Sequence, residues 1–201
     1  NVSTSEYSIG MAASSGSSIN NIGDIYVTGS NSIGMYGDGI GSSVYNNGNI
    51  YLDATGATSL NLKNQMIGIY LDNGAHGENW GDVKTLSNNT NVNTLVGISV
   101  QRGSTFENHG NIEINSDNGV GVYVNNGIIK NYGTITVIGD ESTGVKYKNG
   151  EVAPGVPLTP SNVGGTVTSV GGNSFEELLS NPTATVGNVV IAPDANGRLV
   201  A

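Results

Sequence analysis

The feature of this chain that most restricts its fold is a short phrase that recurs along it. The phrase is Asn, any residue and Gly, followed by an apolar residue two places after the Gly. Its clear copies begin at Asn21, Asn46, Asn79, Asn108 and Asn131, with spacings of 25, 33, 29 and 23 residues. Repeats with periods of roughly 20–50 residues are typical of solenoids and stacked arrays. The sequence therefore predicts a stack of similar units with one long outer surface.

Each copy also carries apolar residues at every second position, which indicates β-strands rather than helices. A second phrase, apolar-Gly-apolar, precedes each copy, as in Ile33-Gly34-Met35 and Ile67-Gly68-Ile69. Strands joined by Gly and Asn corners would make one coil, and neighbouring coils would bury their inner faces by stacking. The expected fold is all-β, a single-stranded parallel β-helix. Two inner columns are predicted, one of Ile25, Ile50, Val83, Ile112 and Ile135, the other of Ile33, Ile67, Val96 and Val120.

The repeated Asn has a structural interpretation. An Asn at a turn bonds nearby backbone groups and tolerates left-handed conformations. Identical amides stacked from coil to coil can also bond one another, as Asn ladders do in cross-β stacks. We expect a structural ladder of Asn21, Asn46, Asn79, Asn108 and Asn131. The Gly two places later would provide a bend that a side chain would obstruct.

The chain divides near residue 150. Residues 1–150 are expected to form coils with repeats of about 23–34 residues, interrupted by insertions at Ala54–Gln65 and Ser87–Thr94. Such insertions usually project from one face of a solenoid. Residues 151–201 should hold a looser coil, a Pro-rich insertion, a short helix near 174–180 and a further strand or cap. The helix is predicted because Ser174-Phe175-Glu176-Glu177 has the form of a capping box.

Composition and charge disfavour several classes of partner. The net charge is −9 and no basic stripe exists, which argues against nucleic acid. No apolar run approaches the roughly 20 residues of a spanning helix, so we expect no membrane insertion by this segment. There is no Cys, and His76 and His109 stand alone in the sequence, so we expect no metal and no cofactor.

The alternating Ser-Ile-Gly-Met-Tyr and Asn-Asn-Gly-x-Ile-x-Leu phrases, most clearly in Ser32–Leu52, resemble passenger regions of large type V secretion autotransporter adhesins, especially fusobacterial ones. The likeness covers about residues 8–150. It implies a right-handed parallel β-helix, secretion to the bacterial cell surface, and anchoring through an outer-membrane barrel not present in this chain. It also implies adhesion to host cells or to other bacteria.

Aromatic residues are the candidate binding groups. Tyr36, Tyr70 and Tyr123 share one outward position of the repeat, and Trp80 is expected beside the insertions. Tyr and Trp suit interfaces because each joins a large apolar ring to a polar group. The alternative is that the Tyr residues only stabilise the sheet across strands. Lys84 and Glu113 share another position and are expected to form a surface ion pair.

The resulting hypothesis is a non-catalytic, monomeric piece of a surface adhesin whose loops bind a host-cell or bacterial protein or glycan. One alternative is a polysaccharide-active enzyme, a lyase or glycosidase, since parallel β-helices host both. Asp24 and Asp82 would then be the carboxylate pair, two coils apart at roughly 9–10 Å from the strand spacing. A second alternative is a structural spacer of a longer adhesin.

Overall fold

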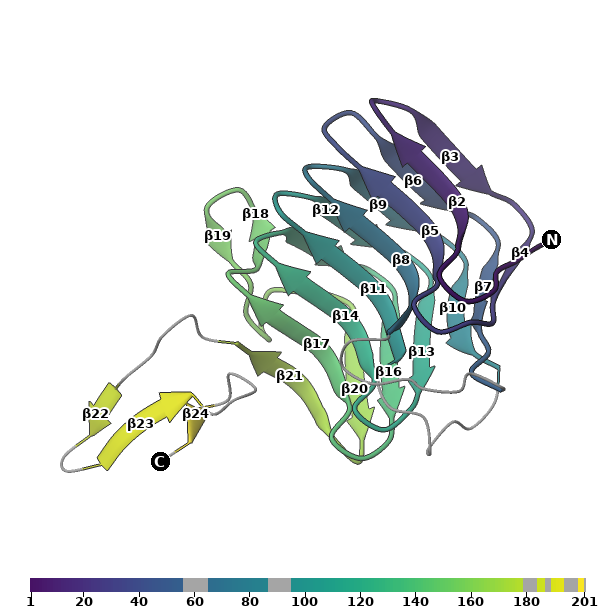
Figure 1. Cartoon of the computed structure of the whole chain (residues 1–201). Helices are drawn as coiled ribbons and strands as arrows, with labels where there is room; N and C mark the ends of the chain where they lie inside the picture. The colour runs from purple at the N-terminus through teal and green to yellow at the C-terminus, as the bar shows by residue number, and fades with distance from the viewer. Residues whose placement is uncertain (56–64, 87–94, 179–183, 187–188, 194–198, 201) are drawn as a thin grey trace.

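The fold is a parallel β-helix, seen in a computed structural model that describes residues 1–55, 65–86, 95–178, 184–186, 189–193 and 199–200 (Figure 1). Three seven-stranded sheets, here named A, B and C, run along the stack. The chain passes from sheet B to sheet C to sheet A and returns to sheet B one coil later. Pairing between successive coils is parallel, and one antiparallel hairpin within the last coil extends sheet C at its end. Among the described residues there is no helix, and so none that could cross a membrane.

The strands are short, as expected for a coil with three corners. Sheet A contains β1 (Val2–Ser3), β4 (Asp24–Val27), β7 (Asn49–Leu52), β10 (Asp82–Thr85), β13 (Asn111–Asn115), β16 (Thr134–Ile138) and β20 (Thr166–Val170). Sheet B contains β2 (Ile9–Ser14), β5 (Ile33–Asp38), β8 (Met66–Asp72), β11 (Leu95–Gln101), β14 (Val120–Asn125), β17 (Thr143–Lys148) and β21 (Asn173–Glu177). Sheet C contains β3 (Ser18–Asn21), β6 (Ser43–Asn46), β9 (His76–Asn79), β12 (Thr105–Asn108), β15 (Ile128–Asn131), β18 (Glu151–Ala153) and β19 (Val156–Pro157).

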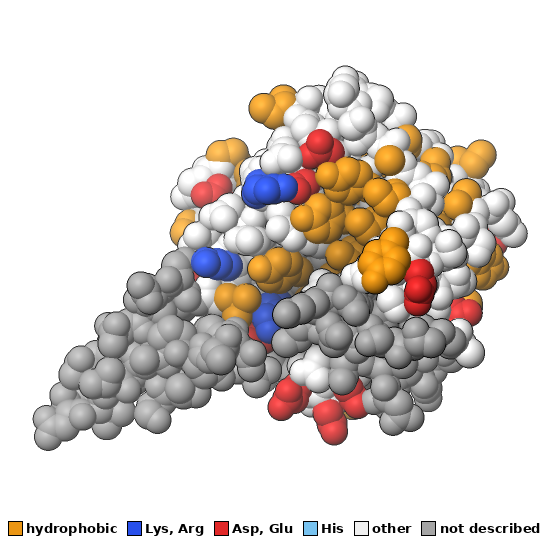
Figure 2. Space-filling model, viewed as in Figure 1, with side chains coloured by type: hydrophobic (Ala, Val, Ile, Leu, Met, Phe, Trp, Pro, Cys, Tyr) orange, Lys and Arg blue, Asp and Glu red, His pale blue; other side chains and the backbone are white. Residues whose placement is uncertain are grey.

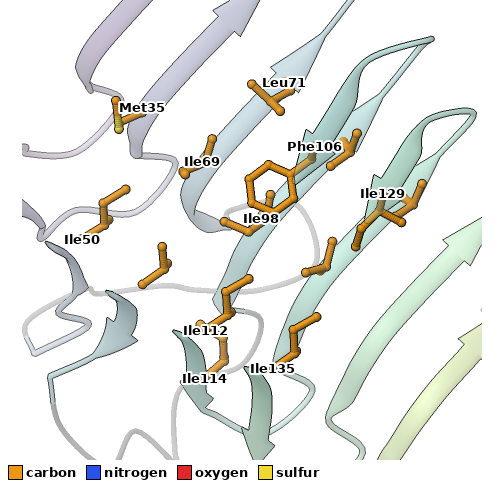
Figure 3. Close-up of a cluster of buried hydrophobic side chains, with 14 of the residues drawn as sticks. Met35, Ile50, Ile69, Leu71, Ile98, Phe106, Ile112, Ile114, Ile129 and Ile135 are labelled. Carbon is orange, nitrogen blue, oxygen red and sulfur yellow. The ribbon is translucent and has the colours of Figure 1, made fainter. Parts of the chain in front are cut away.

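One predicted inner column is confirmed. Ile25, Ile50, Val83, Ile112 and Ile135 pair in register along sheet A, and each is at most 1% exposed. They meet inner side chains of the other two sheets in one continuous core (Figure 3). Phe106 of sheet C is the largest fully buried side chain among the described residues, and its in-register neighbour in the preceding coil is Gly77. A Cβ on Gly77 would meet Leu71 and Phe106, so this Gly leaves the room that the ring fills.

The second predicted inner column is wrong. Ile67, Val96 and Val120 form a separate cluster with Tyr70 and Tyr123, on the outer side of sheet B, and Ile33 packs against it. The residues just after each Gly, such as Ile69 and Ile98, occupy the core instead. The physical reason is the Gly of the apolar-Gly-apolar phrase. Strict alternation would place both apolar residues on one side, but the register pairs skip the Gly, where the stacked backbones approach closely.

Apolar side chains also gather on the viewed face, over the strands of sheet B (Figure 2). The three members of the outer cluster, Ile67, Val96 and Val120, are no more than 9% exposed. Sheet B therefore packs apolar side chains on both faces, which is common for parallel sheets.

The short helix predicted near 174–180 is also wrong where the structure describes it. Ser174–Glu177 lies in strand β21, which pairs with β17 in register. Phe175 packs against the core opposite Val145, and Glu176 forms an ion pair with Lys146 at 3.2 Å. These pairings across the stack outweigh the local preference of a capping box, as tertiary context often does.

The coil after residue 150 remains part of the same stack. Strands β18, β20 and β21 each add to one of the three sheets, so the coils continue to Glu177. Beyond it, β22 (Ala184–Val186), β23 (Val189–Pro193) and β24 (Leu199–Val200) form a small antiparallel sheet. Most of the two predicted insertions, residues 56–64 and 87–94, lies outside the described residues.

Candidate ligand-binding surface

The corner between sheets C and A is built on the repeated Asn. Each Asn side chain donates from Nδ2 to Oδ1 of the Asn in the next coil, from Asn21 through Asn46, Asn79 and Asn108 to Asn131, at 2.7–2.9 Å. All five amides are buried. Most also donate to the carbonyl oxygen of the Gly two places later, as Asn79 does at 3.0 Å. The ladder thus holds the corner of each coil directly above the next.

The Gly of the phrase is required by close packing of backbones. A Cβ on Gly48, Gly81, Gly110 or Gly133 would collide with the carbonyl oxygen of the equivalent Gly in the preceding coil. None of these residues has a positive φ. The requirement is therefore space between stacked turns, rather than an unusual backbone conformation.

The middle position of the phrase points its side chain outward at this corner. In three successive coils it carries Trp80, His109 and Tyr132, whose rings stack along the helix. The centroids of Trp80 and His109 are 3.8 Å apart with planes inclined by 4°. Those of His109 and Tyr132 are 4.7 Å apart and inclined by 15°. We call these three residues the ring stack; Trp80 is 53% and Tyr132 59% exposed.

Charged residues of sheet C hold the ring stack in place. The indole Nε1 of Trp80 donates to Glu78 at 2.8 Å, and His109 Nε2 lies 3.5 Å from Glu107. Lys130 pairs with the other oxygen of Glu107 at 3.3 Å. The pKa of Glu78 is lowered, mainly because its carboxylate accepts the hydrogen bond from Trp80. Burial acts in the opposite direction and raises this pKa, whereas the hydrogen bond with His76 lowers it further.

A shallow hollow lies on sheet A beside the ring stack. Its volume is about 180 Å³, and its lining side chains come from the same three coils: Asp82, Lys84, Asn111, Ile112, Glu113, Thr134 and Thr136. Asp82 accepts from Lys84 at 2.9 Å and from Asn111 at 3.1 Å. The hydrogen bond from Lys84 is the main cause that lowers the pKa of Asp82. The predicted Lys84–Glu113 ion pair is replaced by the pair with Asp82, although Lys84 and Glu113 are in register.

The tyrosine row on sheet B is a separate surface. Tyr36 and Tyr70 are paired in register on neighbouring strands, and their ring centroids are 5.6 Å apart. Ser99 occupies the same position on the next strand, between Tyr70 and Tyr123. Tyr70 donates to Asp72 at 3.4 Å, and Arg102 Nε donates to the same carboxylate at 2.6 Å. Burial and the charge of Asp72 raise the pKa of Tyr70 to about 12, so its hydroxyl stays protonated and able to donate.

The predicted binding residues therefore lie on two surfaces. Trp80 occupies the corner between sheets C and A, whereas Tyr36, Tyr70 and Tyr123 lie on sheet B. The expectation that Trp80 lies beside the insertions concerns residues 56–64 and 87–94, which lie outside the described residues. Sequence reasoning missed His109 and Tyr132. The signal was present, since both share the middle position of the phrase with Trp80.

The proposed catalytic pair is separated by another residue. Asp24 and Asp82 both pair in register with Asn49, which donates to Asp24 at 3.0 Å. Both carboxylates are thus engaged by amide groups of neighbouring coils. In the part of the chain that the structure describes, no three His, Asp or Glu side chains are grouped to hold a metal ion.

Comparison with known proteins gives one partial match. Residues 1–82 match the family model described as the BigA third pectate lyase-like domain. No curated protein and no solved structure matches the chain. The matched segment ends at the first residue of β10, so it includes Trp80 but not His109 or Tyr132. This likeness agrees with the parallel β-helix and supports the broader interpretation of an adhesin-like surface domain.

Proposed function

We propose that this chain is a non-catalytic segment of a secreted bacterial surface adhesin that binds ligands on host cells or other bacteria. In this proposal the parent protein is an autotransporter anchored by an outer-membrane barrel elsewhere in its sequence, and the segment acts as a monomer. The observation that carries the proposal is the ring stack. Its outer two rings, Trp80 and Tyr132, are more than half exposed, and both stack on His109 between them. Exposed Trp and Tyr on a fixed frame are typical contact residues.

The backbone that carries the ring stack is held in place before any ligand arrives, so binding would cost little conformational entropy. The Asn ladder and the glycine contacts fix the backbone under each ring. The hydrogen bond from Trp80 to Glu78 and the contact of His109 with Glu107 restrict two of the three rings. A ligand would therefore meet a surface that is already ordered, which lowers the entropic cost of association.

The test is adhesion of beads coated with the purified chain to epithelial cells and to bacteria. Wild-type beads should adhere, and the variant Trp80→Ser/Tyr132→Ser should adhere at least about tenfold less, as expected when contact aromatics are truncated. Tyr7→Ser is the matched control, because Tyr7 is 77% exposed but lies in the first coil, far along the stack. Failure of wild-type beads to adhere to any cell type would refute the proposal and favour a spacer.

A polysaccharide-active enzyme is the second candidate, because the family model matched by residues 1–82 is pectate lyase-like. The carboxylate to test is Asp82, which lies in the hollow next to Lys84. Breakdown of polygalacturonate or of a neutral polysaccharide by the wild-type chain, abolished in Asp82→Ala, would support this candidate over adhesion.

A further inference from the structure

The ring stack and the hollow are parts of one surface. In each of three coils, the chain places a ring at the corner, then a Gly, then a polar side chain in the hollow, and a second polar side chain two residues further along the strand. The sets are Trp80, Asp82 and Lys84; His109, Asn111 and Glu113; and Tyr132, Thr134 and Thr136. Parallel register between the coils aligns these sets. Aromatic and hydrogen-bonding groups thus lie next to each other across three coils.

The size of the hollow restricts what it can hold. Pockets for drug-sized molecules have volumes of about 300–1,000 Å³. A hollow of about 180 Å³ is smaller, so it fits a single small ring rather than a large cofactor. Because the hollow is partly open to solvent, that ring can belong to a longer chain lying on the surface.

The lining is rich in groups that hydrogen-bond to hydroxyls. Thr134 donates to Asn111 at 2.6 Å, and Asn111 donates to Asp82, so these side chains are already oriented. Glu113 is exposed, and its carboxylate accepts no hydrogen bond among the contacts of the described residues. A carboxylate accepts from ligand hydroxyls, while the amide and hydroxyl groups can donate or accept. A ligand with several adjacent hydroxyls satisfies both kinds of partner.

The charge of the hollow disfavours an acidic ligand. Asp82 and Glu113 carry two negative charges against the one positive charge of Lys84, and Lys84 is already paired with Asp82. The whole chain carries a net charge of −9. Like charges brought together across an interface are unfavourable, so a polyuronate, the substrate class suggested by a pectate lyase-like fold, is a poor fit.

We propose that this surface binds an uncharged saccharide chain, with one sugar ring in the hollow and an adjacent unit against the exposed rings at the corner. The proposal rests on the proposed adhesive function and specifies its ligand class. Glu113, Asn111 and Thr136 bind the hydroxyls of the sugar. Trp80 and Tyr132 supply apolar surface with a polar edge, as aromatic residues at wet interfaces do.

The test uses the fluorescence of Trp80, which is the only tryptophan in the chain. The intact chain is titrated with a panel of neutral glucose-, galactose-, mannose- and N-acetylglucosamine-based oligosaccharides, with polygalacturonate as the acidic comparison. At least one neutral oligosaccharide should change the emission saturably, and polygalacturonate should not compete with it. Glu113→Gln and Thr136→Val should each weaken this binding about tenfold, whereas Glu6→Gln, an exposed carboxylate in the first coil, should leave it unchanged.

Circular dichroism of each variant separates loss of binding from loss of folding, and calorimetry repeats the titration without relying on Trp80. The proposal is overturned if no neutral oligosaccharide binds, if polygalacturonate binds in preference, or if both hollow variants bind like the wild type. Cell adhesion that persists under any of these results would leave the adhesive function intact and refute only the saccharide site. If the wild-type chain showed neither cell adhesion nor saccharide binding, both proposals would be refuted.

Discussion

At the residue scale, the two fixed positions of the corner phrase do different work. Asn supplies hydrogen bonds between coils, because each of the three inner amides, Asn46, Asn79 and Asn108, donates to one neighbouring Asn and accepts from the other. Gly supplies space, because the stacked turns approach closer than any Cβ allows. The sequence was sufficient to predict the ladder from spacing. It was not sufficient to distinguish a bend from a close approach, since both require Gly.

The glycine requirement predicts a difference between two copies of the same phrase. Gly81→Ala should destabilise the chain by about 3 kcal/mol or more, because the new Cβ would push neighbouring backbones apart. Gly23→Ala is the control, since the nearest atom to its Cβ is a side-chain oxygen at 3.8 Å. Urea denaturation followed by circular dichroism measures both. Equal effects of the two substitutions would show that conformation, rather than space, selects Gly here.

The ladder predicts the cost of removing an internal amide. Asn79→Ala deprives Asn46 Nδ2 of its acceptor and Asn108 Oδ1 of its donor, and unsatisfied buried polar groups cost about 1–3 kcal/mol each. The free energy of unfolding should fall by about 2–4 kcal/mol. Asn47→Ala, at the exposed neighbouring position of the phrase, should change it by less than about 0.5 kcal/mol. If the ladder did not stabilise the corner, Asn79→Ala and Asn47→Ala would change the free energy of unfolding by equally small amounts.

At the element scale, periodicity predicted the strands of sheet A well and those of sheet B in part. Sheet A alternates strictly, so Ile25 and its column face inward as expected. Sheet B departs from alternation at its Gly, which turns Ile67 outward and leaves Ile69 inward. The misassigned helix has a related cause, because pairing of β21 with β17 is a contact between distant residues that a local capping signal does not contain.

The inward column predicts a sharp contrast between two isoleucines. Ile50→Asp would place an unpaired carboxylate in the core, where Ile50 is 0% exposed, and should unfold the stack or cost several kcal/mol. Ile22→Asp changes a residue that is 82% exposed and should be nearly neutral. Thermal melting by circular dichroism compares them. A normal melting curve for Ile50→Asp would contradict the assignment of the core.

Only part of the candidate site could be predicted from the sequence. Trp80 stands out as the single tryptophan, but its stacking on His109 becomes apparent only when the middle positions of the phrase are aligned. The shape and charge of the hollow depend on side chains from three coils and on whether Lys84 pairs with Asp82 or with Glu113. That choice between Asp82 and Glu113 is a matter of side-chain geometry that spacing does not contain.

At the scale of the whole molecule, the hydrogen bond between Trp80 of the ring stack and Glu78 should make the stability of the fold depend on pH in acid. Hydrogen bonding to Trp80 lowers the pKa of Glu78 below its ordinary value of 4.5. A carboxyl with a lowered folded pKa contributes stability above its unfolded pKa, and this contribution is lost as the pH falls through the folded value. Between pH 5 and pH 3 the wild-type chain should therefore lose more stability than Glu78→Gln does.

Urea midpoints at the two pH values measure this difference, and Glu6→Gln serves as a control that should follow the wild type. Since Glu78 is partly exposed, the difference between the curves is expected to be small but of fixed sign. A steeper loss of stability in Glu78→Gln than in the wild type would contradict the hydrogen bond between Trp80 and Glu78.

We propose that this β-helix binds surface ligands and does not process them. The most direct measurement incubates the intact chain with epithelial and bacterial cells and with their isolated surface polysaccharides, then records both the protein retained and the sugar fragments released. We predict retention of the wild-type chain, reduced retention of Trp80→Ser/Tyr132→Ser, and no released fragments. Released fragments that disappear in Asp82→Ala, or no retention on any cell, would show that the β-helix is not a non-catalytic adhesive segment.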